Sequence, residues 1–227
     1  IDYDYLVEKD ADHIWTYLEG TKVESKEIEQ KFINLPIKPT LLTEATANES
    51  NLSSILPTKN IAHIATHGFF YPKPSLAAEI VESDVISNEE VAFRGGNRGM
   101  GYNFYVTNKN PMMRSGIALS GATQVWNNSD IDLANDGVLT AQDIAIMDLR
   151  KLDLMVLSAC ETGLGDIEGS EGVYGLQRSL KMAGVNNIIM SLWQVPDKET
   201  KEFMILFYDN LLSTNNVRNS FQKAQLT

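Results

Sequence analysis

The chain is poor in the side chains that most often carry catalysis, with one cysteine and three histidines among 227 residues. A single cysteine excludes a disulfide within the chain, so we expect an intracellular, cytoplasmic protein. No apolar run approaches the roughly 20 residues that a membrane-spanning helix requires. No signal peptide pattern opens the chain either, so we expect no membrane partner. Because thiols and imidazoles are so few, the position of each one is informative.

Basic residues are also few: the chain has 19 lysines and arginines but 30 aspartates and glutamates, so its formal charge is −11. This acidity argues against nucleic acid as a direct partner, because phosphate backbones are bound by basic patches. The length suffices for one large domain. We expect residues 1–227 to form one domain with a long insert at about 71–136. Because Ile1 rather than methionine comes first, we also expect a larger parent protein.

Short apolar runs alternate with amphipathic segments along the chain. Runs that are nearly all apolar and too short for helices predict buried strands; they span 61–66, 154–159 and 187–193. Further strands are predicted at 40–43 and 115–120, and helices at about 22–32, 48–56, 141–147, 172–182 and 197–212. Buried strands that alternate with helices indicate an α/β fold, with a mostly parallel sheet and helices on both faces.

The only cysteine and one of the histidines each follow a predicted buried strand. His67 comes after the first strand and Cys160 after the second, where open α/β sheets hold their ligand sites. If these strands are neighbours, about 4.8 Å apart, the two side chains lie close together. An imidazole beside a thiol raises the thiolate fraction and can then protonate a leaving amine. The sequence therefore suggests a cysteine–histidine dyad, with the N–H groups of Gly68 and Cys160 as an oxyanion hole.

Other interpretations of these residues stay open. A lone cysteine after an apolar run is most often an inert core residue. His63 and His67 would share one face of a strand, which defines a further hypothesis, a metal-dependent hydrolase. The run lacks the glutamate of the helical H-E-x-x-H zinc motif, so we predict no metal site and interpret His63 as a buried structural histidine. The glycines between residues 163 and 172 lack the ending of a phosphate-binding loop.

Several linked segments resemble the signatures of the CHAT domain, a caspase-like peptidase family of clan CD that is often fused to tetratricopeptide repeats. The two main ones are Ile-Ala-His-Ile-Ala-Thr-His-Gly at 61–68 and Leu-Ser-Ala-Cys-Glu-Thr-Gly-Leu-Gly at 157–165. The others lie at 20–22, 114–122, 169–176, 183–185, 191–197, 207–208 and 224–225. The resemblance thus covers most of the chain.

This resemblance implies a three-layer, caspase-like α/β fold with a mostly parallel sheet of about six strands and helices on both faces. It implies a bacterial, cofactor-free cysteine endopeptidase in which His67 and Cys160 act on a protein or peptide substrate. A substrate pocket is implied beside the strand after the cysteine, at Ser191, Leu192, Trp193 and Asp197. For Trp193 a core aromatic and for Asp197 a helix cap are the alternatives.

Regulation and the rival hypothesis complete the expectations. Many CHAT domains are controlled by flanking modules, so repeat domains or other regulatory modules are expected partners. The rival hypothesis is a catalytically silent caspase-like module, in which the fold is kept and partner binding is the output.

Overall fold

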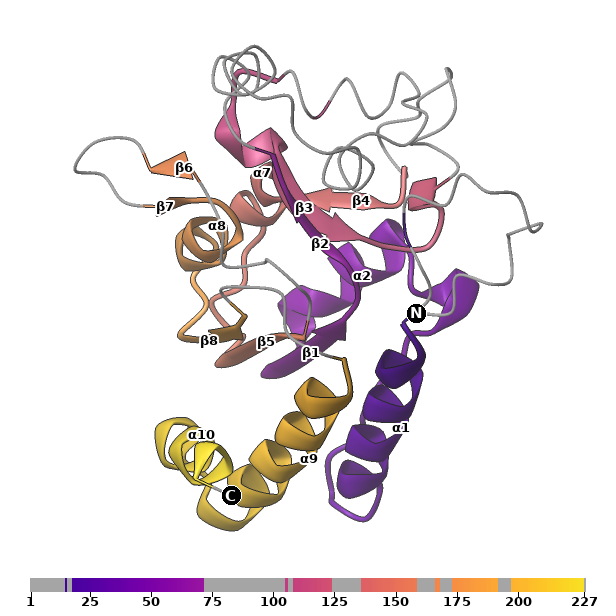
Figure 1. The fold of residues 1–227 in the computed structure, drawn as a ribbon, viewed down its shortest axis with the longest axis vertical. Helices are drawn as coiled ribbons and strands as arrows, with labels where there is room; N and C mark the ends of the chain where they lie inside the picture. The colour runs from indigo at the N-terminus through magenta and orange to yellow at the C-terminus, as the bar shows by residue number, and fades with distance from the viewer. Residues whose placement is uncertain are drawn as a thin grey trace, which may run out of the picture.

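The centre of the protein is a parallel sheet of three strands in the order β1–β5–β8 (Figure 1). The computed structural model describes Trp15, residues 18–71, Tyr105, and residues 108–123, 136–158, 166–167, 173–191 and 197–226. The sheet comprises β1 (Ile61–Ala65), β5 (Leu154–Ser158) and β8 (Asn187–Met190). All three predicted buried strands are therefore confirmed, and the strands that precede His67 and Cys160 are direct neighbours.

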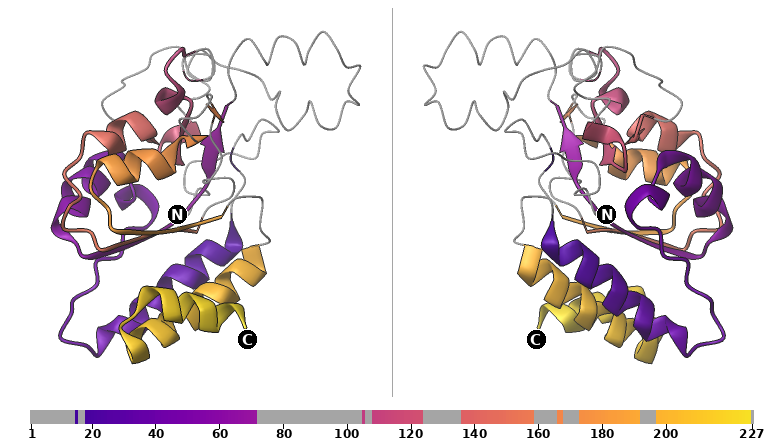
Figure 2. Two further views of the ribbon diagram at one scale, coloured as in Figure 1. Left: turned by 90° about the vertical axis from the view of Figure 1, so that its left-hand side faces the viewer. Right: turned by 90° about the vertical axis from the view of Figure 1, so that its right-hand side faces the viewer.

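Helices α1 (Glu19–Ile33) and α9 (Asp197–Thr214) cover one face of this sheet, and α10 (Val217–Gln225) packs against α9 (Figure 2). Side chains alternate between the faces of a strand, and Leu154 and Val156 of β5 point to this side. They join a core that includes Phe207 of α9 and Ile28 of α1. An ion pair between Lys31 of α1 and Asp209 of α9 also joins these two helices on the surface.

The opposite face is covered by α2 (Glu49–Ile55), α7 (Ala141–Ala145) and α8 (Leu176–Met182), so the sheet is the middle of three layers (Figure 2). The other residues of β5, Met155 and Leu157, point here and pack in one core with Leu180 of α8. Helix α7 begins with the predicted cap, in which the Thr140 hydroxyl accepts from the backbone N–H of Asp143. Burial on both faces explains why the three central strands are almost continuously apolar.

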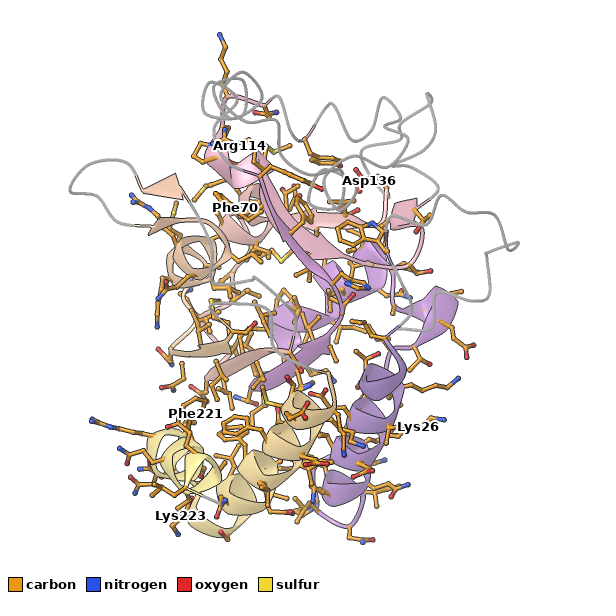
Figure 3. The ribbon with its side chains drawn as sticks, in the orientation of Figure 1. Lys26, Phe70, Arg114, Asp136, Phe221 and Lys223 are labelled. Carbon is orange, nitrogen blue, oxygen red and sulfur yellow. The ribbon has the colours of Figure 1, made fainter. Side chains whose placement is uncertain are left out.

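A second sheet has three antiparallel strands, and its first strand begins shortly after β1 ends. It contains β2 (Gly68–Phe70), β3 (Ser115–Ala118) and β4 (Val138–Thr140). The side chain of Arg114 is only 1% exposed and donates from Nε to the carbonyl of Tyr71, at 3.0 Å. Figure 3 shows Arg114 and Asp136 in this part of the molecule. Segments far apart in the sequence are thus joined next to His67.

The remaining elements are short. They are the 3-10 helices η2 (Glu44–Thr46), η3 (Leu56–Thr58) and η4 (Pro111–Met113), and a two-stranded ribbon of β6 (Asp166–Ile167) and β7 (Val173–Tyr174). Among the described residues, no helix combines the length and the apolar character needed to cross a membrane.

The expected α/β class, with a parallel sheet between helices, is confirmed. In the described part of the chain the parallel sheet has three strands, where the resemblance implied about six in one sheet; three others form the antiparallel sheet. The strand predicted at 40–43 was wrong, because Thr43 instead caps η2. The helix predicted from 172 begins only at Leu176, after β7. Helix α10 was not predicted.

Candidate active site

The backbone around His67 is held by the antiparallel sheet. His67 lies in the bend between β1 and β2 and is half-buried. Its carbonyl accepts a hydrogen bond from the N–H of Ala118, at 2.9 Å. The hydroxyl of the preceding residue, Thr66, donates to the carbonyl of the same Ala118 at 2.5 Å. Two hydrogen bonds to one residue of β3 therefore fix where the chain turns at His67.

The N–H of Gly68 is not used by the neighbouring strand. Residues opposite one another in an antiparallel ladder alternate between hydrogen-bonded and non-bonded pairs. His67 and Ala118 form a bonded pair, so the next pair, Gly68 and Ile117, is a non-bonded one. On the other side of β3, the N–H of Leu119 donates to the carbonyl of Gly137 at 2.6 Å. By the same alternation, the backbone groups of Ile117 are bonded to β4. The N–H of Gly68 therefore points away from β3.

The imidazole of His67 has an aromatic neighbour that is remote in sequence. The ring centroid of Trp15 lies 5.4 Å from that of His67, with 36° between the planes. Trp15 also lies 6.2 Å from the ring of Phe69, which is 4% exposed. These rings belong to an aromatic cluster of Trp15, Phe69, Tyr71 and Tyr105, which packs with Val138 of β4. His67 thus lies at the edge of this aromatic cluster.

The register of the parallel sheet relates His67 to the only cysteine. Ala65, the last residue of β1, is paired with Ser158, the last residue of β5. His67 and Cys160 each come two residues after this pair. Cys160 itself lies outside the described residues. Strands β1 and β5 are therefore adjacent and end side by side, which meets the condition on which the sequence made the dyad depend.

The residues expected to form a substrate pocket follow β8. Ser191 comes directly after this strand and is half-buried. Leu192 and Trp193 lie outside the described residues. Asp197 is the first residue of α9, and its side chain is not described. The pocket therefore remains a prediction, on a segment that begins where β8 ends.

His63 lies in the interior, between two helices and the sheet. Its Nε2 is 2.8 Å from Oε1 of Glu24 on α1, and its Nδ1 is 3.2 Å from the hydroxyl of Tyr208 on α9. The side chains of His63 and Glu24 are only 9% and 1% exposed. With Nε2–H donating to the carboxylate, Nδ1 of a neutral ring accepts from the phenol. His63 is thereby confirmed as a buried structural histidine.

Burial shapes the chemistry of this triad of Glu24, His63 and Tyr208. It raises the pKa of Tyr208 well above its ordinary value, and the charge of Glu24 adds to the effect. The phenol therefore stays protonated and keeps its hydrogen to donate. Because Glu24 and Tyr208 occupy both ring nitrogens of His63, this histidine has no nitrogen left for a metal. Within the described ranges, no group of three or more histidine, cysteine or acidic side chains is arranged to hold one.

Sequence reasoning missed Trp15, the pair Thr66–Ala118 and Glu24. Trp15 and Glu24 lie 52 and 39 residues before the histidines that they contact, and no local pattern links such distant positions. The one available signal for Glu24 was its place on the apolar stripe of α1, four residues before Ile28, where a solvated carboxylate is not expected.

Comparison with known proteins gives a family match over nearly the whole chain and a partial match to a much longer protein. Residues 5–227 match the family of the CHAT domain. Tetratricopeptide repeat protein 28 from Mus musculus is 33% identical over 93 residues, which is 40% of this chain and 4% of that protein. The chain therefore matches a small part of a much longer relative.

Proposed function

Because the chain belongs to the CHAT domain family, we propose that it is a cysteine endopeptidase with His67 and Cys160 as its catalytic dyad. The observation that carries the proposal is the register of β1 and β5. Ala65 and Ser158 are paired, and neighbouring strands are about 4.8 Å apart. A histidine and a cysteine two residues beyond this pair suit a thiol–imidazole dyad at the carboxyl edge of the sheet.

In the proposed reaction, Sγ of Cys160 attacks the scissile carbonyl and His67 takes the thiol proton. The tetrahedral intermediate collapses to a thioester as the C–N bond breaks, and His67 gives the proton to the leaving amine. Water then attacks the thioester with His67 as base, which releases the acid and restores the thiol. The outward N–H of Gly68 suits an oxyanion hole, and its place in a non-bonded pair of the ladder supports this role.

The substrate in this proposal is an extended peptide beside β8, with Ser191, Leu192, Trp193 and Asp197 lining its pocket. Ser191 follows the last residue of β8 without a break, and a strand edge can receive a peptide backbone. Flanking modules are the proposed regulators. The match to a tetratricopeptide repeat protein supports repeat domains among them.

Cleavage of a peptide library by the full-length protein tests the proposal. The variants Cys160→Ala and His67→Ala are expected to lose cleavage, because a nucleophile and a general base contribute several orders of magnitude in rate. Lys26→Ala, on the exposed side of α1 (Figure 3), is the surface control and keeps wild-type rates. Cleavage should also continue in the presence of chelators, which would inhibit a metal-dependent hydrolase.

Two results would reject the endopeptidase. Equal cleavage by wild type and Cys160→Ala would show that this thiol is not the nucleophile. No cleavage and no labelling of Cys160 by a thiol-directed peptide probe, with the native flanking modules present, would favour the catalytically silent module.

A further inference from the structure

The backbone of His67 is fixed, but backbone bonds alone do not orient its imidazole. The hydrogen bonds from Ala118 and Thr66 hold the main chain at this bend. A histidine side chain still turns about χ1 and χ2, and χ2 is broad in the absence of contacts. A general base must keep one nitrogen within about 2.6–3.2 Å of the proton it takes. The orientation of the ring therefore depends on contacts of the ring itself.

We propose that Trp15 is a positioning residue that holds the imidazole of His67 in one orientation; the inference rests on the proposed function. The centroid distance of 5.4 Å and the tilt of 36° place the indole in direct ring contact with the imidazole. Aromatic pairs at such distances stabilise one mutual orientation. A ring-to-ring contact does not itself occupy either imidazole nitrogen, so proton transfer remains possible.

Trp15 is itself packed against a further aromatic ring and lies close in sequence to a helix that contacts β1. Its ring packs against Phe69, which is in turn in contact with Tyr71 and Tyr105 at centroid distances of 5.6 and 6.2 Å. Trp15 also lies four residues before α1. That helix is tied to β1 by the contact of Glu24 with His63, four residues before His67.

The N-terminal segment thus contacts two histidines. Glu24 contacts His63, which is structural, and Trp15 contacts His67, which is proposed to react. This arrangement assigns the aromatic cluster a role in orienting His67. No sequence motif marks the residues of the cluster.

The test compares two substitutions of Trp15 in the full-length protein. Trp15→Leu removes the ring but keeps an apolar side chain, and Trp15→Phe keeps a ring. Small misplacements of a catalytic group cost up to about 100-fold in rate, so we expect kcat to fall roughly tenfold in Trp15→Leu. KM should change by less than about twofold, because substrate contacts are kept, and Trp15→Phe should recover most of the loss.

The matched control is Phe221→Leu. This substitution also exchanges a partly buried aromatic ring for leucine, but Phe221 packs with Phe203 and Phe207 between α9 and α10, in a different core (Figure 3). Its kcat is expected to stay at the wild-type value. An equal fall of kcat in both leucine variants would mean that Trp15 acts only through stability, which would overturn the proposal.

A second readout does not depend on activity. In NMR spectra of the histidine rings, of which the chain has three, the His67 signals should carry a ring-current shift and the relaxation of an ordered ring. Trp15→Leu should abolish the shift and mobilise the ring, while His63 stays unchanged. An equally ordered His67 ring in Trp15→Leu, or a mobile ring with unchanged kcat, would overturn the proposal. If Cys160→Ala cleaves like wild type, the proposed function fails instead, and the NMR result alone decides whether Trp15 orders His67.

Discussion

Removing the carboxylate of Glu24 should destabilise the protein far more than removing an exposed glutamate from the same helix. Glu24 is 1% exposed and is 2.8 Å from Nε2 of His63, whose side chain is 9% exposed. The substitution Glu24→Ala leaves that ring N–H buried without its acceptor. Glu27, three residues further on α1, is exposed, so Glu27→Ala makes the same change of residue type without the burial.

The size of the effect follows from the contact that is lost. Leaving a buried donor unpaired costs about 1–3 kcal/mol, and hydrogen bonds to charged groups lie in the upper part of the usual range. We therefore expect Glu24→Ala to lower the free energy of unfolding by about 2–3 kcal/mol. Glu24→Gln keeps an amide oxygen at the same place and should cost about half as much. Glu27→Ala should stay within about 0.5 kcal/mol of wild type.

Urea unfolding followed by circular dichroism measures these differences. With a slope of about 2–3 kcal/mol per molar urea, the midpoint of Glu24→Ala should fall by roughly 1 M. A midpoint within the error of the Glu27→Ala value would contradict this prediction, because the carboxylate would then be energetically equivalent to a solvated one.

Two further predictions concern Tyr208 and the turn before β4. Because burial raises the pKa of Tyr208 above its ordinary 10.0, unfolding releases its proton above pH 10, and stability should fall as pH rises. Tyr208→Phe should reduce that slope by up to about 1.4 kcal/mol per pH unit in urea unfolding at pH 9–11; an unchanged slope would contradict the burial of the phenol. Gly137 has a φ of 76°, and a Cβ there would meet the backbone N of Ala122 at 2.3 Å. Gly137→Ala should therefore cost about 2 kcal/mol more than Gly121→Ala, where φ is 100° but the nearest atom is 4.0 Å away; equal losses in thermal unfolding would rule out the clash.

The sequence predicted the parts of the fold that depend on local pattern. The continuous apolar runs of β1, β5 and β8 identified the central strands, because a strand buried on both faces has no polar side to alternate with. Thr140 and Asp143 identified the start of α7 through a local capping box. The sequence indicated a mostly parallel sheet, but that β1 and β5 are direct neighbours in it comes from the structure.

The failures have physical causes that are also local. At 40–43 the residue types suit a strand, but the N–H of Thr43 donates to the Thr46 hydroxyl, which donates back to the Thr43 carbonyl. Such side-chain bonds favour a turn over a ladder. Helix α10 was not predicted, although its cap is a local feature. The side chain of Asn216 accepts a hydrogen bond from the N–H of Asn219 at 2.9 Å, and asparagine is a favoured helix cap.

For the candidate site, the sequence indicated the proposed pair of reacting groups but not its surroundings. His67 and Cys160 stand out because each follows a buried strand. Trp15 and the Thr66–Ala118 contact do not, because they depend on how distant segments pack around β2 and β3. Local patterns therefore suggest candidate reacting groups, whereas the contacts that orient them come from the three-dimensional structure.

The rate at which Cys160 reacts with a small neutral alkylating reagent tests the dyad most directly, because the chain has no other cysteine to react. We expect wild type to be alkylated at pH 6 at least about tenfold faster than His67→Ala, since an imidazole beside the thiol raises its thiolate fraction. Equal rates in the two proteins, both rising only toward the ordinary thiol pKa of about 8.5, would contradict the dyad.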